Sequence, residues 1–136
     1  METHQLVFLK LGGSLITEKT KPLTSRLDVI QRIANEIAQA LEATPDLQLL
    51  IGHGSGSFGH TVASQYQTQA GGRSKDYWRG FAKVWRAARQ LNQVVVEQLS
   101  QASIPVIAFP PSSGVITRGK QIQTWDTSPI QSALER

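Results

Sequence analysis

The sequence contains no cysteine among its 136 residues. This absence excludes disulfide bonds, thiolate catalysis and metal sites built on cysteine, and it fits a reducing compartment. No apolar run approaches the length that a membrane-spanning helix needs, so we expect no membrane partner. Residues 1–5 are polar and carry neither the basic nor the apolar segment of a signal peptide, which favours a cytoplasmic location.

Charged residues are sparse, at 18% of the chain, and positive charge is only slightly in excess. The sequence has 14 Lys and Arg against 10 Asp and Glu, a net charge of +4 that suits acidic small molecules and nucleic acids equally. Four basic residues recur on the outer side of an expected long helix: Arg79, Lys83, Arg86 and Arg89. We interpret them as a solvated face and expect no nucleic-acid partner.

Strands and helices are expected to alternate along a single domain. Short apolar runs predict three strands, at residues 6–11, 47–51 and 105–109. Helical spacing of apolar residues predicts three helices, at residues 27–41, 61–66 and 81–99. A β-hairpin is expected within residues 114–123, followed by a helix start at residues 126–129. This order predicts an α/β fold, a mostly parallel sheet with helices on both faces.

Two glycine-rich turns follow the first two expected strands. The first is Lys-Leu-Gly-Gly-Ser at residues 10–14, and the second is His-Gly-Ser-Gly-Ser-Phe-Gly-His at residues 53–60. Turns of this kind at the carboxyl end of a strand hold phosphate, because their N–H groups converge on the anion. Two of them in one small α/β chain indicate phosphoryl transfer.

A rival interpretation starts from the second turn, since residues 54–59 satisfy the G-x-G-x-x-G pattern of dinucleotide-binding oxidoreductases. That fold also needs an acidic residue at the end of the next strand, about 20 residues on. Asp76 lies at roughly that distance but in a polar loop with no strand before it. The interpretation as a dinucleotide-binding oxidoreductase is therefore disfavoured. The absence of a G-x-x-x-x-G-K-[ST] sequence leaves a Walker-type ATPase without support as well.

The sequence resembles the amino-acid kinase superfamily, and within it the isopentenyl phosphate kinases. The matching residues are 10–17, Lys19 and 53–60. Fosfomycin kinases share much of the pattern and are kept as an alternative, and Ser55 stands where many relatives have glycine. The resemblance implies a three-layer sandwich, of which residues 1–136 form the amino-terminal, acceptor-binding part. The nucleotide-binding half is absent, and the chain stops soon after its last helix start, so we expect a truncated chain.

The resemblance implies ATP-dependent phosphorylation of isopentenyl phosphate to isopentenyl diphosphate in isoprenoid biosynthesis, with Mg²⁺ accompanying ATP. Lys10 would bridge the transferred phosphate, and the amides of Gly12, Gly13 and Ser14 would cradle the ATP phosphates. Lys19 would supply further positive charge. No general base is needed, because a phosphate monoester has a second pKa of about 6 and is already mostly a dianion at neutral pH.

On the acceptor side, the resemblance implies that Gly54, Ser55, Gly56 and Gly59 bind the phosphate of isopentenyl phosphate. His60 would donate a hydrogen bond to that phosphate and act as a catalytic residue with the two lysines. No residue is assigned as a metal ligand. A structural alternative for His60 is a capping role at the helix start. A non-catalytic fragment that binds a phosphorylated ligand without turnover is the third hypothesis.

Other residues are expected to be structural. His53 should pack at the end of its strand, and the aromatic residues Trp78, Phe81 and Trp85 should lie in the core. An apolar slot for the isoprenoid tail is expected between the short helix after His60 and the long helix. Family members are often dimers through this half, so we expect a homodimer.

Overall fold

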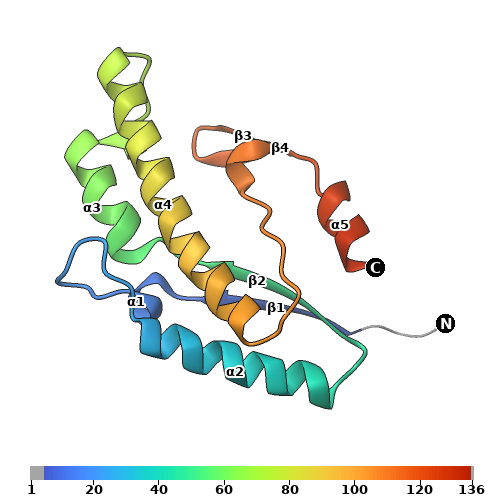
Figure 1. Ribbon diagram of the computed structural model, residues 1–136. Helices are drawn as coiled ribbons and strands as arrows, with labels where there is room; N and C mark the ends of the chain where they lie inside the picture. The colour runs from blue at the N-terminus through green and yellow to red at the C-terminus, as the bar shows by residue number, and fades with distance from the viewer. Residues whose placement is uncertain (1–4, 136) are drawn as a thin grey trace. The chain divides into compact units, whose positions relative to one another are not determined.

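The computed structural model describes residues 5–135, which fall into two units divided between Val106 and Ile107. In the first unit the elements follow in the order β1 (Gln5–Leu11), α1 (Gly13–Ile16), α2 (Leu27–Ala43), β2 (Leu47–His53), α3 (Gly56–Tyr66), η1 (Thr68–Ala70) and α4 (Lys75–Gln101) (Figure 1). No helix in the described part of the chain combines the length and the hydrophobicity needed to cross a bilayer.

The centre of the first unit is a parallel pair of strands, β1 and β2, as the two apolar runs predict. Their register places Gln5 opposite Leu47 and Leu11 opposite His53, so both strands end at the same level. The glycine turns that follow them therefore leave the same edge of the sheet. Helix α2 connects the two strands, in the manner required for parallel neighbours.

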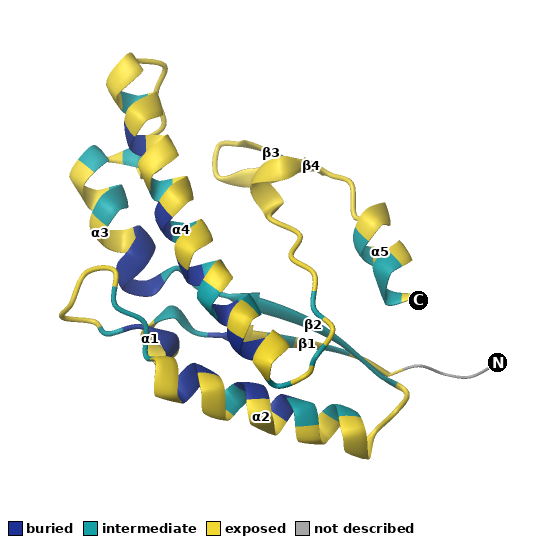
Figure 2. Ribbon diagram, in the orientation of Figure 1, coloured by how far each residue is buried: buried dark blue, intermediate teal, exposed yellow. Residues whose placement is uncertain are grey.

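The core lies on one face of this pair. Leu9, Leu11, Leu49 and Ile51 point to that face. They join buried side chains of four helices: Ile16 of α1, Ile30, Ala34 and Ile37 of α2, Phe58 of α3, and Ala87, Leu91, Val95 and Leu99 of α4. Figure 2 shows this burial on the facing sides of α2 and α4. Residues of a strand alternate between faces, and on β1 the opposite face is exposed, with Leu6 at 55% and Phe8 at 68%.

Helix α4 is too long for all of its apolar residues to reach this core. Its 27 residues span about 40 Å, whereas the seven-residue strands span about 23 Å. Its carboxyl-terminal half is buried, as predicted, through Leu91, Val95 and Leu99. The prediction that Trp78, Phe81 and Trp85 lie in the core is wrong, because these side chains are 56%, 43% and 40% exposed.

Two expected elements differ in the structure. The short helix predicted over residues 61–66 begins at Gly56, so that half of the second glycine turn is the first turn of α3. The strand predicted over residues 105–109 does not form. Ile104, just before this segment, and Val106 within it pack against the core of the first unit, but Ile107 is 70% exposed, and no described strand pairs with the segment.

The second unit contains η2 (Pro111–Ser113), the antiparallel hairpin β3 (Val115–Arg118) and β4 (Gln121–Trp125), and α5 (Ser128–Leu134). The hairpin and the helix start are confirmed. Asp126 holds that start, because its Oδ1 accepts a hydrogen bond of 3.0 Å from the Ser128 amide and a second bond from the Ser128 hydroxyl. Both bonds favour the carboxylate, and they lower the pKa of Asp126 below its usual value.

We expect Ser128→Ala to raise the pKa of Asp126, because the side-chain hydrogen bond is the larger cause of its lowering. The stabilisation of this turn is then present above the usual aspartate pKa and is lost as pH falls through the lowered one. Carboxyl-carbon NMR titration of both variants measures the shift. Equal Asp126 midpoints in the two proteins would contradict this account. Ser64→Ala provides the serine control, because the Ser64 hydroxyl donates to the Thr61 carbonyl within α3.

Candidate active site

The first glycine turn is the start of a one-turn helix. Gly12 is its N-cap, with φ −62°, and its carbonyl accepts from the amides of Leu15 at 2.9 Å and Ile16 at 3.3 Å. The amides of Gly13 and Ser14 precede the first helical hydrogen bond and have no carbonyl partner among the described residues. Lys10 is the last residue but one of β1 and is exposed. The turn thus offers two amides and a nearby ammonium group.

The second turn offers two of the four amides that the resemblance implies for the acceptor phosphate. The Gly54 amide donates to the Leu11 carbonyl at 3.0 Å, and the Gly59 amide donates to the Ser55 carbonyl at 3.3 Å, so both are used within the fold. The amides of Ser55 and Gly56, at the start of α3, have no partner within residues 5–135. These two are therefore the groups that can donate to an anion here.

The two turns touch through their backbones. A Cβ atom built on Gly13 would lie 2.5 Å from the Gly56 nitrogen, and one built on Gly54 would lie 2.8 Å from the Gly13 nitrogen. Real Cβ atoms do not approach other atoms so closely, so glycine is required at both positions for steric reasons. The four candidate amides of Gly13, Ser14, Ser55 and Gly56 consequently come from turns in direct contact, with no side chain between them.

Sequence reasoning missed the side chains that hold this contact. The hydroxyl of Thr17 donates to the Gly13 carbonyl at 2.7 Å and accepts from the Ser57 amide at 3.0 Å. Ser57 is itself buried, and its own hydroxyl has no hydrogen-bond partner among the described residues. Thr17 is the last residue of the motif at residues 10–17 that predicts the first glycine turn. No sequence pattern pairs it with Ser57, 40 positions later.

The structure also places the two histidines of the second turn and Lys19. His53 is structural, as expected: its Nε2 lies 3.0 Å from the Asn92 amide nitrogen and its Nδ1 lies 3.1 Å from the Gly54 oxygen. His60 is exposed on α3, at an open surface hollow of about 760 Å³ that it lines with Thr61, Ser64 and Gln67. Lys19 is exposed in the turn between α1 and α2, and no contact joins it to either glycine turn.

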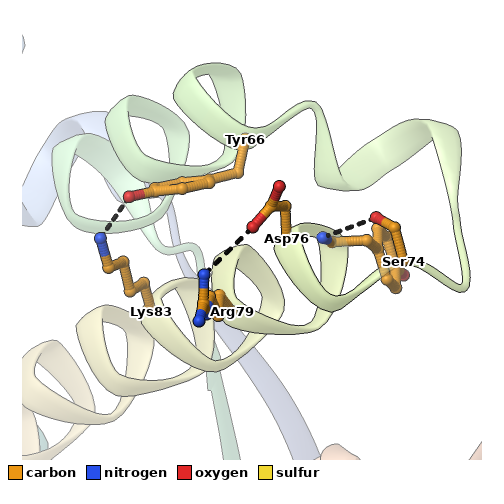
Figure 3. Close-up of polar contacts among 6 residues, drawn as sticks. Tyr66, Ser74, Asp76, Arg79 and Lys83 are labelled. Atoms are coloured by element: carbon orange, nitrogen blue, oxygen red, sulfur yellow. Dashed lines mark hydrogen bonds and ion pairs between the residues drawn. The ribbon is translucent and has the colours of Figure 1, made fainter.

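Helices α3 and α4 are in direct contact beyond the hollow. A Cβ built on Gly80 would lie 2.7 Å from Cγ of Tyr66, so the tyrosine ring rests on the glycine. The Tyr66 hydroxyl is bonded to the Lys83 ammonium group, and Asp76 pairs with Arg79 at 3.3 Å (Figure 3). The apolar slot expected between these helices is therefore closed at Tyr66. The exposed stripe Trp78–Phe81–Trp85 lies on α4 outside this contact.

Known proteins resemble this chain in sequence and in structure. The model of the amino acid kinase family matches residues 5–136. The isopentenyl phosphate kinase of Methanocaldococcus jannaschii is 36% identical to the chain over 137 residues, and that of Methanothermobacter thermautotrophicus is 35% identical over 136 residues. Each alignment covers 96% of this chain but only 52% and 49% of the relative.

Solved structures show the same relation. An X-ray structure of an isopentenyl phosphate kinase superposes with a TM-score of 0.85 at 34% identity, covering 96% of this chain and 54% of the other. The product complex of the Thermoplasma acidophilum isopentenyl phosphate kinase gives a TM-score of 0.80 at 26% identity. The chain thus spans about half the length of the proteins that it matches.

Proposed function

Because this chain belongs to the amino acid kinase family, we propose that it is the acceptor-binding part of a kinase that converts ATP and isopentenyl phosphate to ADP and isopentenyl diphosphate. The observation that carries this proposal is the backbone contact between the two glycine turns at the carboxyl edge of β1 and β2. It supplies two anion-binding amide pairs side by side. The names of the similar proteins support isopentenyl phosphate as the acceptor.

The first turn fits the phosphates of ATP. A Cβ on Gly12 would have no atom within 4 Å, so the space over this turn is open, and the Gly13 and Ser14 amides are available to donate. ATP supplies the transferred phosphoryl group, with Mg²⁺ bound to its phosphates. Lys10 would neutralise charge that develops on that group, and Lys19 would add positive charge if its turn closes over the nucleotide. No residue of the chain is proposed as a ligand of Mg²⁺.

The second turn fits the acceptor phosphate. The free amides of Ser55 and Gly56 lie at the amino terminus of the 11-residue helix α3, where the helix dipole also favours an anion. His60 is one turn further along the same helix and would donate a hydrogen bond to the phosphate. Gly54 and Gly59 would contribute through close packing, since their amides are used within the fold.

The reaction requires that the two phosphate groups be held in position and that their negative charge be neutralised. The acceptor phosphate is already a nucleophilic dianion at neutral pH, since its second pKa is about 6. Two anions must then be held in line against their mutual repulsion, which is the part of catalysis that fixed amides and lysines supply. Turns in backbone contact bring the donor and acceptor phosphates next to each other without a side chain between them.

The remaining parts of the proposal concern the environment of the enzyme. We place it in the cytoplasm as a homodimer, and the exposed stripe Trp78–Phe81–Trp85 is the apolar surface available to the isoprenoid tail or to a partner. A fosfomycin-kinase-like acceptor preference is the alternative within the same family. The chain spans about half of its relatives, so binding is the property to test first.

Titration calorimetry of isopentenyl phosphate into the chain tests the acceptor site. We expect saturable binding, and we expect His60→Ala to weaken it about 10- to 150-fold, because a hydrogen bond to a charged group contributes about 1.5–3 kcal/mol. Ser64→Ala is the matched control: Ser64 lines the same hollow, but its hydroxyl donates to the Thr61 carbonyl.

The outcomes separate the alternatives. Equal affinities for the unsubstituted chain and His60→Ala would remove His60 from the site. Saturable binding of fosfomycin without binding of isopentenyl phosphate would replace the acceptor and keep the family. Binding of both ATP and isopentenyl phosphate without formation of ADP would identify a ligand-binding fragment.

A further inference from the structure

Thr17 occupies a buried position directly after α1, with 1% of its surface exposed. Its backbone forms a β-bridge with Ser25, which fixes the start of the following loop. Its hydroxyl donates one hydrogen bond to the Gly13 carbonyl and accepts another from the Ser57 amide. One small side chain therefore joins the first glycine turn to the first turn of α3.

The bond to Ser57 replaces an ordinary helix cap. The amide at the second or third position of a helix usually donates a hydrogen bond to the side-chain oxygen of the N-cap residue. In α3 the N-cap is Ser55, which makes no such bond, and the Ser57 amide is satisfied by Thr17 instead. The cap of α3 thus comes from the other turn, 40 residues earlier in the chain.

The surrounding backbone leaves room only for this hydroxyl. Gly56 has φ +47°, and a Cβ atom on it would overlap the Thr17 hydroxyl and approach the Gly13 carbonyl to 2.6 Å. The Gly54 amide adds a second link between the turns through its bond to Leu11. Thr17 is the side chain in this contact that bonds to both turns.

We propose that Thr17 is a positioning residue that fixes the spacing between the two glycine turns, and with it the spacing between the ATP phosphates and the acceptor phosphate. This inference rests on the proposed function for its consequence in catalysis. The Thr17 hydroxyl is buried and its two hydrogen bonds go to backbone groups of the turns, so it acts through the backbone and does not touch the substrate. A displacement of about 1 Å between reacting groups can slow a reaction about 100-fold, which is why such a spacing matters.

Three variants isolate the hydroxyl. Thr17→Val keeps the shape and removes both hydrogen bonds, whereas Thr17→Ser keeps the hydroxyl. Thr61→Val is the matched control, because the Thr61 hydroxyl donates to the Ser57 carbonyl at 3.1 Å within α3 and does not reach the first turn. In the ligand-free chain, we expect hydrogen exchange at the Ser57 amide to become about tenfold faster in Thr17→Val. Exchange should stay unchanged in Thr17→Ser and Thr61→Val.

Affinity separates positioning from stability. We expect Thr17→Val to weaken isopentenyl phosphate binding about fivefold to tenfold and Thr17→Ser to restore it, because the Ser55 and Gly56 amides move with α3. Ile37→Val, a core change in α2 away from both turns, lowers stability and should leave the affinity unchanged. Unchanged Ser57 exchange in Thr17→Val, or equal loss of affinity in Ile37→Val, would overturn the proposal.

Failure of the proposed function gives a different result. An unsubstituted chain that binds no isopentenyl phosphate would refute the acceptor assignment. Thr17 would then be judged by exchange at Ser57 alone: faster exchange in Thr17→Val would support its role in holding the turns, and unchanged exchange would refute it.

Discussion

Replacing Gly56 by alanine should destabilise the chain by about 2–5 kcal/mol. Two costs combine at this position. A residue with a Cβ atom at φ +47° is strained by about 1–2 kcal/mol, and the new atom would be forced against the Thr17 hydroxyl and the Gly13 carbonyl, an overpacking that costs about 1–3 kcal/mol. Urea unfolding followed by circular dichroism gives the difference. Binding of isopentenyl phosphate should be lost in the same variant.

Gly71→Ala is the matched control for this prediction. Gly71 also has a positive φ, +74°, but a Cβ atom there would meet nothing within 4 Å. With ψ 162°, Gly71 lies in a backbone region that is essentially restricted to glycine. The control therefore carries backbone strain without the contact between turns, and we expect it to cost about 1–3 kcal/mol and to leave binding unchanged. Equal destabilisation in the two variants would show that the turns do not press on each other at Gly56.

Replacing Leu91 by alanine should cost about 2–5 kcal/mol as well, for a different reason. Leu91 is fully buried, with 0% of its surface exposed, in the cluster that α2, α4 and the covered face of the sheet share. Removal of a leucine side chain from such a site loses apolar burial and leaves a cavity. Because Leu91 supplies none of the amides or charged groups of the candidate site, isopentenyl phosphate affinity should persist at temperatures where the variant is folded.

Trp78→Ala tests whether the amino-terminal half of α4 lies outside the core. Its indole is 56% exposed and contacts the rings of Tyr77 and Phe81, with centroids 5.3 and 5.5 Å away. Such ring pairs contribute about 0.5–1.5 kcal/mol, so we expect a loss of that size despite the larger side chain removed. A loss as large as that of Leu91→Ala would place Trp78 in the core after all.

The parts of the fold that the sequence predicts correctly are those set by local pattern. Short apolar runs identified β1 and β2, and a turn-rich segment between extended residues identified the hairpin of β3 and β4. The helix start at Ser128 was found because Asp126 and Pro129 act on their immediate neighbours. In each case the sequence pattern that predicts the element spans only a few residues.

The incorrect predictions concern features that are determined by residues distant in the sequence. Helix α3 begins early, at Gly56, because Thr17 caps it from another turn and because Gly56 and Gly59 are needed for close packing. The aromatic residues of α4 have core-like spacing, but the helix extends past the strands that would cover them. For the site, the glycine pattern located both turns, yet which amides are free depends on hydrogen bonds such as that from Gly54 to Leu11.

The exposed face and the open edge of β1 affect how readily the chain aggregates in concentrated solution. Within residues 5–135, β1 and β2 each have one strand neighbour, so each presents an outer row of N–H and C=O groups. A strand edge of this kind is a template on which another chain can add a strand, and flanking apolar side chains such as Leu6 and Phe8 favour that addition. Resistance to β-aggregation will therefore depend more on what covers β1 than on the net charge of +4.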